Sequence, residues 1–209
     1  MKLLLVGATG LVGSHVLALA LNDARISKIV VLTRNVIEAH PKVEMIVTDF
    51  DDFVQTATNW DVDSVICTLG TTMSKAKNKT QFRLVDYNYP LAIAKMANHN
   101  GILSFVLNSS MGADPSSHYF YMKVKGDIEQ AIRKLNYNSL TIIRPGLIEG
   151  DRNEQRLGEQ IMMSLLKLFG GLLPTRLQLN PVQKIAAKML EAALQQKQGV
   201  EIICSEQLT

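Results

Sequence analysis

Seven short runs of apolar residues recur along the chain. Each run is rich in Val, Ile and Leu and shows no alternation with polar residues, a pattern typical of strands that are covered on both faces. We therefore expect buried strands at residues 3–6, 29–32, 45–47, 65–67, 103–107, 140–143 and 200–203.

Segments with the apolar spacing of helices separate these runs. We expect helices at residues 11–21, 81–98, 119–135, 154–169 and 182–196, and a weaker one at 51–58. Strands and helices that alternate in this way form right-handed βαβ units. The predicted fold class is therefore α/β, with a single Rossmann-type, doubly wound parallel sheet that carries helices on both faces.

Residues 151–181 depart from this alternation. They contain an apolar helical segment, the pair Gly170-Gly171, and prolines at positions 174 and 181. Ligands of doubly wound folds bind at the carboxyl ends of the strands. We expect this segment to form a small C-terminal cap on the substrate side of that edge.

Composition fits a globular protein. The chain has 209 residues, of which 47% are hydrophobic and 20% charged, and we expect one Rossmann domain over residues 1–209. The net charge is +3 and no basic run exceeds a dipeptide, which excludes the charge pattern of a nucleic-acid binder. No apolar stretch reaches the roughly 18 residues of a membrane span. Cys67 and Cys204 lie in apolar runs, and as free thiols they favour a reducing, cytoplasmic location.

A glycine-rich turn directly follows the first predicted strand and opens the first predicted helix. This is the context that a dinucleotide-binding fingerprint requires. The spacing is G-x-x-G-x-x-G, in which the glycines allow a tight turn, close approach of the backbone to a pyrophosphate, and close helix–strand packing. The alternative is a glycine-rich turn that holds no ligand. The residues expected to hold the pyrophosphate are Gly7, Ala8, Thr9, Gly10, Leu11, Val12 and Gly13.

The end of the second predicted strand indicates which cofactor binds. Domains that prefer NAD(H) usually place an acidic residue there, on the ribose 2′-hydroxyl. This chain has Arg34, whose guanidinium matches a 2′-phosphate, so NADP(H) is favoured over NAD(H). The alternative is an arginine that is merely exposed in a loop.

Two further segments are expected to contact the adenosine part of the cofactor. Asp49 and Phe50 follow the third strand and are placed to meet the adenine, although Asp49 is as well suited to cap a helix. The segment after the fourth strand is expected to run beneath the ribose, where a glycine lets the backbone come close. Its residues are Thr68, Leu69, Gly70 and Thr71.

The predicted helix at 119–135 contains two overlapping Y-x-x-x-K patterns, Tyr121 with Lys125 and Tyr119 with Lys123. The apolar stripe of this helix passes near Tyr121, whereas Tyr119 lies opposite Ile128. The inward pair is therefore Tyr121 and Lys125. At this spacing the ammonium favours the phenolate of a tyrosine whose ordinary pKa is about 10, so that Tyr121 can exchange a proton with a substrate.

Ser109 and Ser110 follow the fifth predicted strand, at the edge where the nicotinamide is expected. One of these hydroxyls is expected to bind the substrate carbonyl and to stabilise the charge that develops on it. The alternative is that both serines cap a turn.

Together these segments resemble the short-chain dehydrogenase/reductase superfamily, and more closely its atypical branch of Tat-interacting-protein oxidoreductase-like proteins, in a bacterial-type member. The resemblance rests on residues 7–13, 67–72, 109–114, 121–126 and 144–152, and so spans nearly the whole chain. It implies a Rossmann fold, bound NADPH, and a Ser/Tyr/Lys triad formed by Ser109 or Ser110 with Tyr121 and Lys125. The serine–tyrosine interval, eleven or twelve residues, is slightly short of the usual one and leaves the serine undecided.

The resemblance also implies roles for two other places. It puts Pro145, Gly146 and Leu147, after the sixth strand, near the nicotinamide carboxamide. It gives Asn88 as the counterpart of the helix asparagine that often serves in a proton relay, although Asn88 could equally cap or pack. The four histidines show no metal-ligand spacing, so we expect no metal.

The function expected from these features is that of an NADP(H)-dependent oxidoreductase acting on a small carbonyl or alcohol. The alternative is an NADPH-binding regulatory or interaction protein, which a protein partner binds and which has little or no turnover. An epimerase acting on a nucleotide sugar is less favoured, because the segment after Gly150 is short for such a pocket. The substrate pocket is expected from residues 73–79, 111–118 and 149–173.

Overall fold

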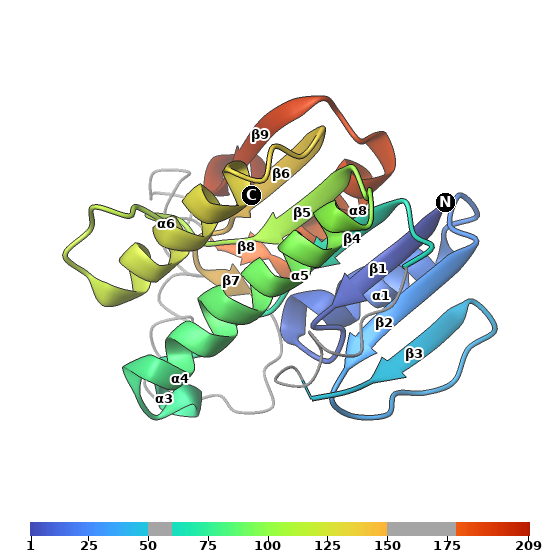
Figure 1. Cartoon of the computed structure of the whole chain (residues 1–209), viewed down its shortest axis with the longest axis horizontal. Coiled ribbons are helices and arrows are strands. Elements are labelled where there is room, and N and C mark those ends of the chain that lie inside the picture. Colours follow the sequence, from blue (N-terminus) through green and yellow to red (C-terminus); the bar gives the residue numbers. More distant parts are fainter. Residues whose placement is uncertain (50–59, 150–178) are drawn as a thin grey trace.

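The strands form one parallel seven-stranded sheet in a computed structural model that describes residues 1–49, 60–149 and 179–209. The strand order is β3-β2-β1-β4-β5-β6-β9 (Figure 1), which confirms the predicted doubly wound α/β fold. The bounds are β1 Lys2–Val6, β2 Lys28–Thr33, β3 Val43–Val47, β4 Ser64–Cys67, β5 Ser104–Asn108, β6 Ser139–Arg144 and β9 Gly199–Cys204.

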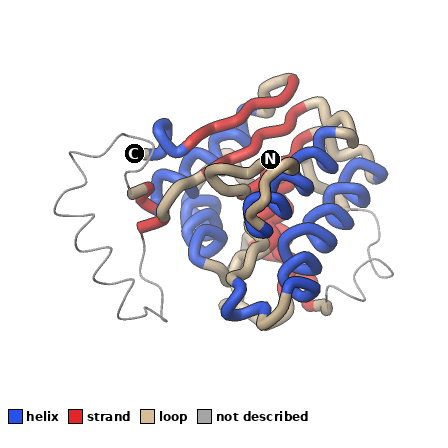
Figure 2. Tube along the Cα trace, turned by 90° about the vertical axis from the view of Figure 1, so that its left-hand side faces the viewer, coloured by secondary structure: helices blue, strands red, loops and turns tan. Residues whose placement is uncertain are grey.

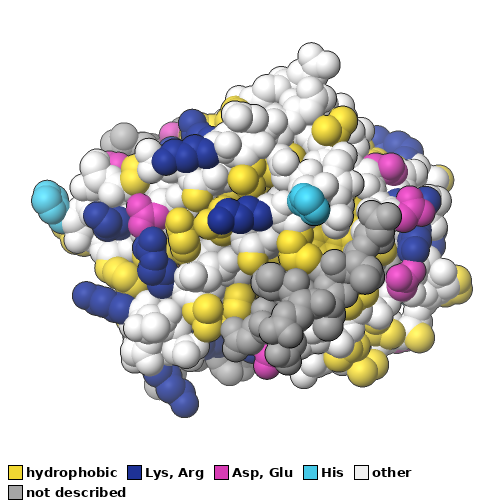
Figure 3. Space-filling model, viewed as in Figure 1, with side chains coloured by type: hydrophobic (Ala, Val, Ile, Leu, Met, Phe, Trp, Pro, Cys, Tyr) yellow, Lys and Arg dark blue, Asp and Glu magenta, His cyan; other side chains and the backbone are white. Residues whose placement is uncertain are grey.

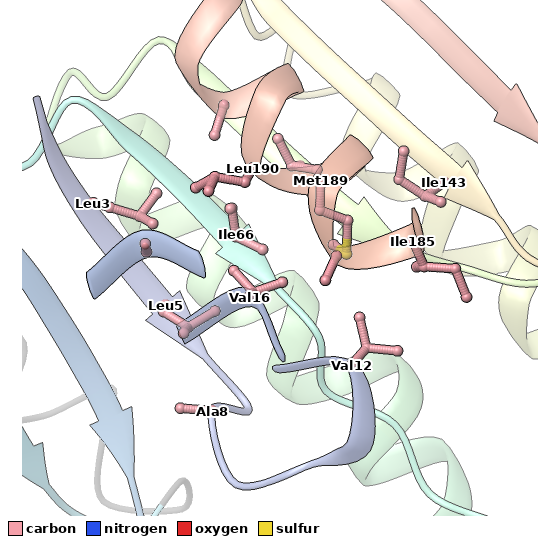
Figure 4. Close-up of a cluster of buried hydrophobic side chains, with 14 of the residues drawn as sticks. Leu3, Leu5, Ala8, Val12, Val16, Ile66, Ile143, Ile185, Met189 and Leu190 are labelled. Atoms are coloured by element: carbon pink, nitrogen blue, oxygen red, sulfur yellow. The ribbon is translucent and has the colours of Figure 1, made fainter. Parts of the chain in front are cut away.

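Helices cover both faces of the sheet, as Figure 2 shows from the side. On one face lie α1 (Leu11–Asn22) and α8 (Val182–Gln195), and on the other lie α5 (Tyr89–His99) and α6 (Phe120–Arg133). Figure 4 shows side chains of α1 and α8 packed together over the strands, with residues of β1 and β4 beneath them. Because alternate residues of each strand point to opposite faces, both layers require apolar strands without alternation.

The predicted helix at 81–98 is interrupted. It comprises α4 (Lys79–Arg83), a π-helical turn η1 (Leu84–Asn88) and α5, and a short α3 (Met73–Ala76) precedes it. In the turn, the backbone N–H of Tyr89 donates to the carbonyl of Leu84, five residues earlier. Such π-turns are rare and insert one extra residue per turn, which changes the direction in which the following side chains point.

Smaller differences concern the ends of elements and the segments beyond them. Leu103, expected to begin a strand, is 59% exposed, and β5 begins one residue later. A second, two-stranded sheet pairs β7 (Ile148–Glu149) with β8 (Asn180–Pro181), and a 3₁₀ turn η4 (Ser205–Leu208) follows β9. The helices expected at 51–58 and 154–169, and all of the expected cap except residues 179–181, lie outside the described residues. Within the described ranges, no helix is long and apolar enough to cross a membrane.

Candidate functional site

The expected site residues lie at one edge of the sheet. Because the strands are parallel, their carboxyl ends meet there, and the arrowheads in Figure 1 point to the side on which α3 and α4 lie. The structure thereby brings together four segments that are distant in sequence. They begin at Gly7 after β1, Thr68 after β4, Ser109 after β5 and Pro145 after β6.

The glycine turn has no room for a side chain at Gly7 or at Gly13. Gly7 has a φ of +87°, and a Cβ on it would lie 2.6 Å from the hydroxyl oxygen of Thr68. A Cβ on Gly13 would lie 2.0 Å from the carbonyl oxygen of Gly7, so α1 can pack this closely on the turn only with glycine there. Gly10 directly precedes α1, and no side chain caps the start of the helix. The exposed Thr9 and Gly10 therefore present a helix N-terminus, which suits an anion such as a pyrophosphate.

The segment after β4 packs against the glycine turn and is bonded to it through Thr68. The hydroxyl of Thr68 lies 2.9 Å from the carbonyl oxygen of Val6 and 3.1 Å from that of Gly7, so it holds the two loops together. Leu69 packs against the apolar core, whereas Gly70 is exposed. A ribose above this segment would therefore meet backbone rather than the Thr68 hydroxyl.

The ends of β2 and β3 carry the residues expected around the adenosine. Arg34 is exposed, and no hydrogen bond or ion pair holds its guanidinium within the part of the chain that the structure describes. The hydroxyl of Thr33 bonds the backbone of Asn35 at 2.8 Å and fixes the loop on either side of Arg34. Asp49 is exposed after the neighbouring strand, and Phe50 lies outside the described residues.

Tyr121 and Lys125 lie one turn apart on α6, at the same edge. Tyr121 is 39% exposed and its ring packs edge-on against Phe82 at 5.8 Å, whereas Tyr119 is 73% exposed. Lys125 is 5% exposed. The structure thus places a buried ammonium beside a phenol that a ligand can reach.

Asp86, from the π-turn η1, holds this ammonium. Its carboxylate lies 2.8 Å from the Lys125 nitrogen, and its other oxygen accepts the backbone N–H of Thr71 at 2.8 Å. Burial favours the neutral amine, but Asp86 and Tyr121 outweigh it, so the pKa of Lys125 lies above its ordinary value of 10.5. Asn88, the residue expected in this area, is exposed. Sequence reasoning missed Asp86 because regular helical spacing does not describe a π-turn.

The two serines after β5 have different surroundings. Ser109 is 4% exposed and its hydroxyl donates to the carboxylate of Glu129 at 2.6 Å. The same carboxylate accepts two hydrogen bonds from the guanidinium of Arg144, at 2.9 and 2.5 Å. Ser110 is only partly buried, and its hydroxyl makes a long bond of 3.3 Å to the carbonyl of Met111. The Ser110 hydroxyl is therefore the one that a ligand can recruit.

The loop after β6 is fixed by a residue that the sequence did not single out. Asn180, fully buried in β8, accepts the backbone N–H of Gly146 at 2.7 Å, and its own N–H donates to the carbonyl of Leu147 at 2.8 Å. Pro145 is buried and Leu147 is 50% exposed. The sequence signal for Asn180 was a polar residue directly before the proline that precedes α8.

Several basic side chains, with an acidic one among them, lie on the left of the face seen in Figure 3, where α3, α4 and α6 lie. A face of this sign attracts anionic ligands from solution. Among the described residues, no cluster of His, Cys, Asp and Glu could hold a metal ion. The basic residues of α3, α4 and α6 are Lys75, Lys79, Arg83, Lys123, the buried Lys125 and Arg133, with Lys77 just after α3.

The residues of the edge fit a dinucleotide: a glycine cradle that a Cβ on Gly7 or Gly13 would fill, an uncapped helix start, and a phenol–ammonium pair. A family model described as NAD(P)H-binding matches residues 7–169. The chain belongs to the NAD(P)H-binding family.

Two relatives are similar over most of their length. Protein FMP52, mitochondrial, of Candida albicans is 35% identical over 176 residues, which cover 79% of this chain and 75% of that protein. Protein HTATIP2 of Rattus norvegicus is 35% identical over 173 residues, covering 80% of this chain and 70% of the relative. These relatives confirm the predicted membership of the atypical short-chain dehydrogenase/reductase superfamily.

Solved structures share the fold. The Bordetella bronchiseptica enzyme WbmH in complex with NAD+ superposes with a TM-score of 0.73 at 16% identity, over 98% of this chain and 75% of that chain. UDP-glucose 4-epimerase of Thermotoga maritima gives a TM-score of 0.72 at 14% identity, over 99% and 77%. At this identity the likeness concerns the fold, because substrate choice is a property of the pocket.

Proposed function

We propose that this protein is an NADP(H)-dependent oxidoreductase that interconverts a small carbonyl compound and its alcohol. The observation that carries the proposal is the pairing of a partly exposed Tyr121 with a buried Lys125 at the sheet edge where the glycine turn begins α1. A bound nicotinamide would supply or accept the hydride. The protein has to hold the substrate oxygen and to move its proton.

In the direction of reduction, the carbonyl carbon gains a hydride while the phenol of Tyr121 gives its proton to the carbonyl oxygen. Lys125, one turn along α6, stabilises the phenolate that remains, and a proton from solvent restores the phenol. The hydroxyl of Ser110 donates a hydrogen bond to the same oxygen as charge develops on it. We assign this role to Ser110 because the Ser109 hydroxyl is already bound to Glu129.

The exposed guanidinium of Arg34 supports NADP(H) as the cofactor, since it can form paired hydrogen bonds with a 2′-phosphate. Calorimetry of NADPH and NADH binding to the purified chain tests this preference. We expect NADPH to bind at least about tenfold more tightly, and Arg34→Ala to remove most of that difference while the affinity for NADH stays unchanged.

The matched control is Arg25→Ala. Arg25 precedes β2 at the opposite edge of the sheet, where it pairs with Asp23 at 2.7 Å. Its replacement should leave both affinities unchanged. Equal affinities for NADPH and NADH in the unaltered chain, or an Arg34→Ala variant that behaves like Arg25→Ala, would overturn the choice of cofactor.

Turnover is tested separately from binding. A panel of small aldehydes, ketones and alcohols is assayed by the appearance or loss of NADPH fluorescence, and any active substrate is then tested with Tyr121→Phe. We expect this variant to bind NADPH as before and to lose at least about a hundredfold in kcat. Retained turnover in Tyr121→Phe would remove Tyr121 as the acid/base group. NADPH binding without turnover of any compound by the unaltered chain would instead favour cofactor-dependent binding of a protein partner as the function.

We also propose that the protein works in the cytoplasm. Its two cysteines are free, and Cys67 is buried, as suits a reducing compartment. Fractionation of cells that carry the tagged chain checks this location, and enrichment in an organelle fraction would contradict it.

A further inference from the structure

Asp86 is a buried acid at the centre of the site, and neither its position in the sequence nor its residue type predicted this. It is 1% exposed and has two partners, the ammonium of Lys125 and the backbone N–H of Thr71. A buried carboxylate is costly unless it is paired. Asp86 is therefore tolerated in this buried position because the Lys125 ammonium and the Thr71 N–H pair with its carboxylate.

We propose that Asp86 is a positioning residue that fixes Lys125 beneath the site and, by neutralising its charge, sets how readily Tyr121 releases its proton. This inference deepens the proposed function, from which it takes the acid/base role of Tyr121. The contact between Asp86 and Lys125 is made directly, at 2.8 Å.

The π-turn is the device that turns Asp86 inward. The turn spans Leu84–Asn88, so it contains both Asp86 and the exposed Asn88. Its extra residue shifts the side chains by roughly one position relative to a regular α-helix. Asp86 therefore points inward to Lys125, whereas Asn88 is exposed.

Asp86 also connects the acid/base helix to the loop after β4. Its bond to the Thr71 N–H fixes that loop, and a Cβ on Gly70 would lie 3.5 Å from the Asp86 carboxylate and 3.8 Å from the Lys125 nitrogen. Gly70 itself is exposed. The ion pair thus lies directly under a loop on which a ribose is expected to rest.

The charges around the pair determine the direction of the effect. Among the described residues, the titratable groups that act on Lys125 are Asp86, Tyr121 and Cys67. Burial raises the pKa of Cys67 to about 11, so this thiol is neutral at lower pH. The Asp86 carboxylate and the Lys125 ammonium then sum to zero charge. Without the carboxylate, these groups sum to +1 instead of zero, so the Tyr121–Lys125 pair releases its first proton at lower pH.

The test follows Tyr121 directly. The chain is labelled with carbon-13 at the tyrosine Cζ, whose NMR shift reports ionisation, and the Tyr121 signal is identified by its absence in Tyr121→Phe. We expect Asp86→Asn to move the titration midpoint of this signal to lower pH by about one unit or more. Asp127→Asn, which removes a carboxylate of α6 paired with Arg83 at 2.8 Å, should leave the midpoint in place.

A charge-compensation cycle keeps the test decisive if Asp86→Asn folds poorly. Lys125→Gln should raise the midpoint, because it leaves the carboxylate unpaired, and the double variant Asp86→Asn with Lys125→Gln should return it toward that of the unaltered chain. A comparison of Lys125→Gln with the double variant then measures the same contribution of Asp86.

Two outcomes would overturn the proposal. One is a midpoint that the removal of Asp86 leaves unchanged in both backgrounds while the other tyrosine signals show a folded chain. The other is a shift produced by Asn88→Ala instead. The titration uses neither cofactor nor substrate, so a failure of NADPH binding or of turnover would bear on the proposed function and leave this result standing.

Discussion

The side-chain oxygen of Asn180 accepts the backbone N–H of Gly146 at 2.7 Å, and this bond joins two segments that are 34 residues apart. The Asn180 amide also donates to the carbonyl of Ser205 at 3.0 Å. One buried side chain therefore holds the loop after β6 against the C-terminal turn.

Replacing Asn180 by Ala should weaken both the fold and cofactor binding. The N–H of the partly buried Gly146 would lose its partner, at a cost of about 2 kcal/mol in the free energy of unfolding. The loosened loop should also lower the affinity for NADPH several-fold. Urea unfolding and calorimetry measure the two effects.

The control for this prediction is Asn98→Ala. Asn98 donates one bond of 2.8 Å to the carbonyl of Leu135, and that contact joins the end of α5 to the residues just after α6. We expect a modest loss of stability and no change in NADPH affinity. An Asn180→Ala variant whose affinity for NADPH equals that of Asn98→Ala would show that the loop after β6 takes no part in binding.

Gly13→Ala should be far more harmful than an ordinary glycine substitution. Its Cβ would lie 2.0 Å from the carbonyl oxygen of Gly7, so α1 would have to move away from the turn. We expect a loss of about 3 kcal/mol or more in urea unfolding. Gly199→Ala, at a φ of +90° with open space around it, carries backbone strain alone and should cost about 1–2 kcal/mol. Equal losses would mean that α1 can adjust to the added methyl group.

The sheet was predictable because a parallel strand must be apolar on both faces, and this requirement leaves an unbroken run such as residues 29–32. The buried polar residues that support the site, Asp86 and Asn180, were not predictable. Asp86 depends on a π-turn, which no periodicity of 3.6 residues reveals. Asn180 is polar yet fully buried, against the usual preference, because the loop after β6 supplies its partners.

The position of Glu129 on the inward face of α6 follows from its spacing in the sequence, but its partners do not. Tyr121, Lys125 and Glu129 are spaced four residues apart and therefore form one stripe along α6. The apolar residues of that helix indicate its buried face, but they do not indicate which groups would pair with a carboxylate on that face. The partners are Ser109, just after β5, and Arg144, at the end of β6, and only the folded sheet brings these two strand ends together.

The two serines should respond differently to removal of their hydroxyls. Ser110→Ala should lower kcat for a substrate found with NADPH by about tenfold or more, with little change in stability. Ser109→Ala should instead lower the free energy of unfolding by about 1–2 kcal/mol, because the carboxylate of Glu129 loses a bond of 2.6 Å. Each variant is measured by both kinetics and urea unfolding. A larger fall in kcat for Ser109→Ala would reassign the substrate contact to Ser109.

The thiol of Cys67, at the end of β4, should make stability depend on pH in the alkaline range. Burial raises the pKa of this thiol from 9.0 to about 11. Between these values the unfolded chain has released a proton that the folded chain still holds, so the free energy of unfolding falls as pH rises. We expect this thiol to contribute a loss of about 2 kcal/mol between pH 9.0 and 11, measured by urea unfolding. Cys67→Ala should lack that contribution, whereas Cys204→Ala, at a half-buried thiol of β9, should retain it; equal slopes in the two variants would refute the assignment to Cys67.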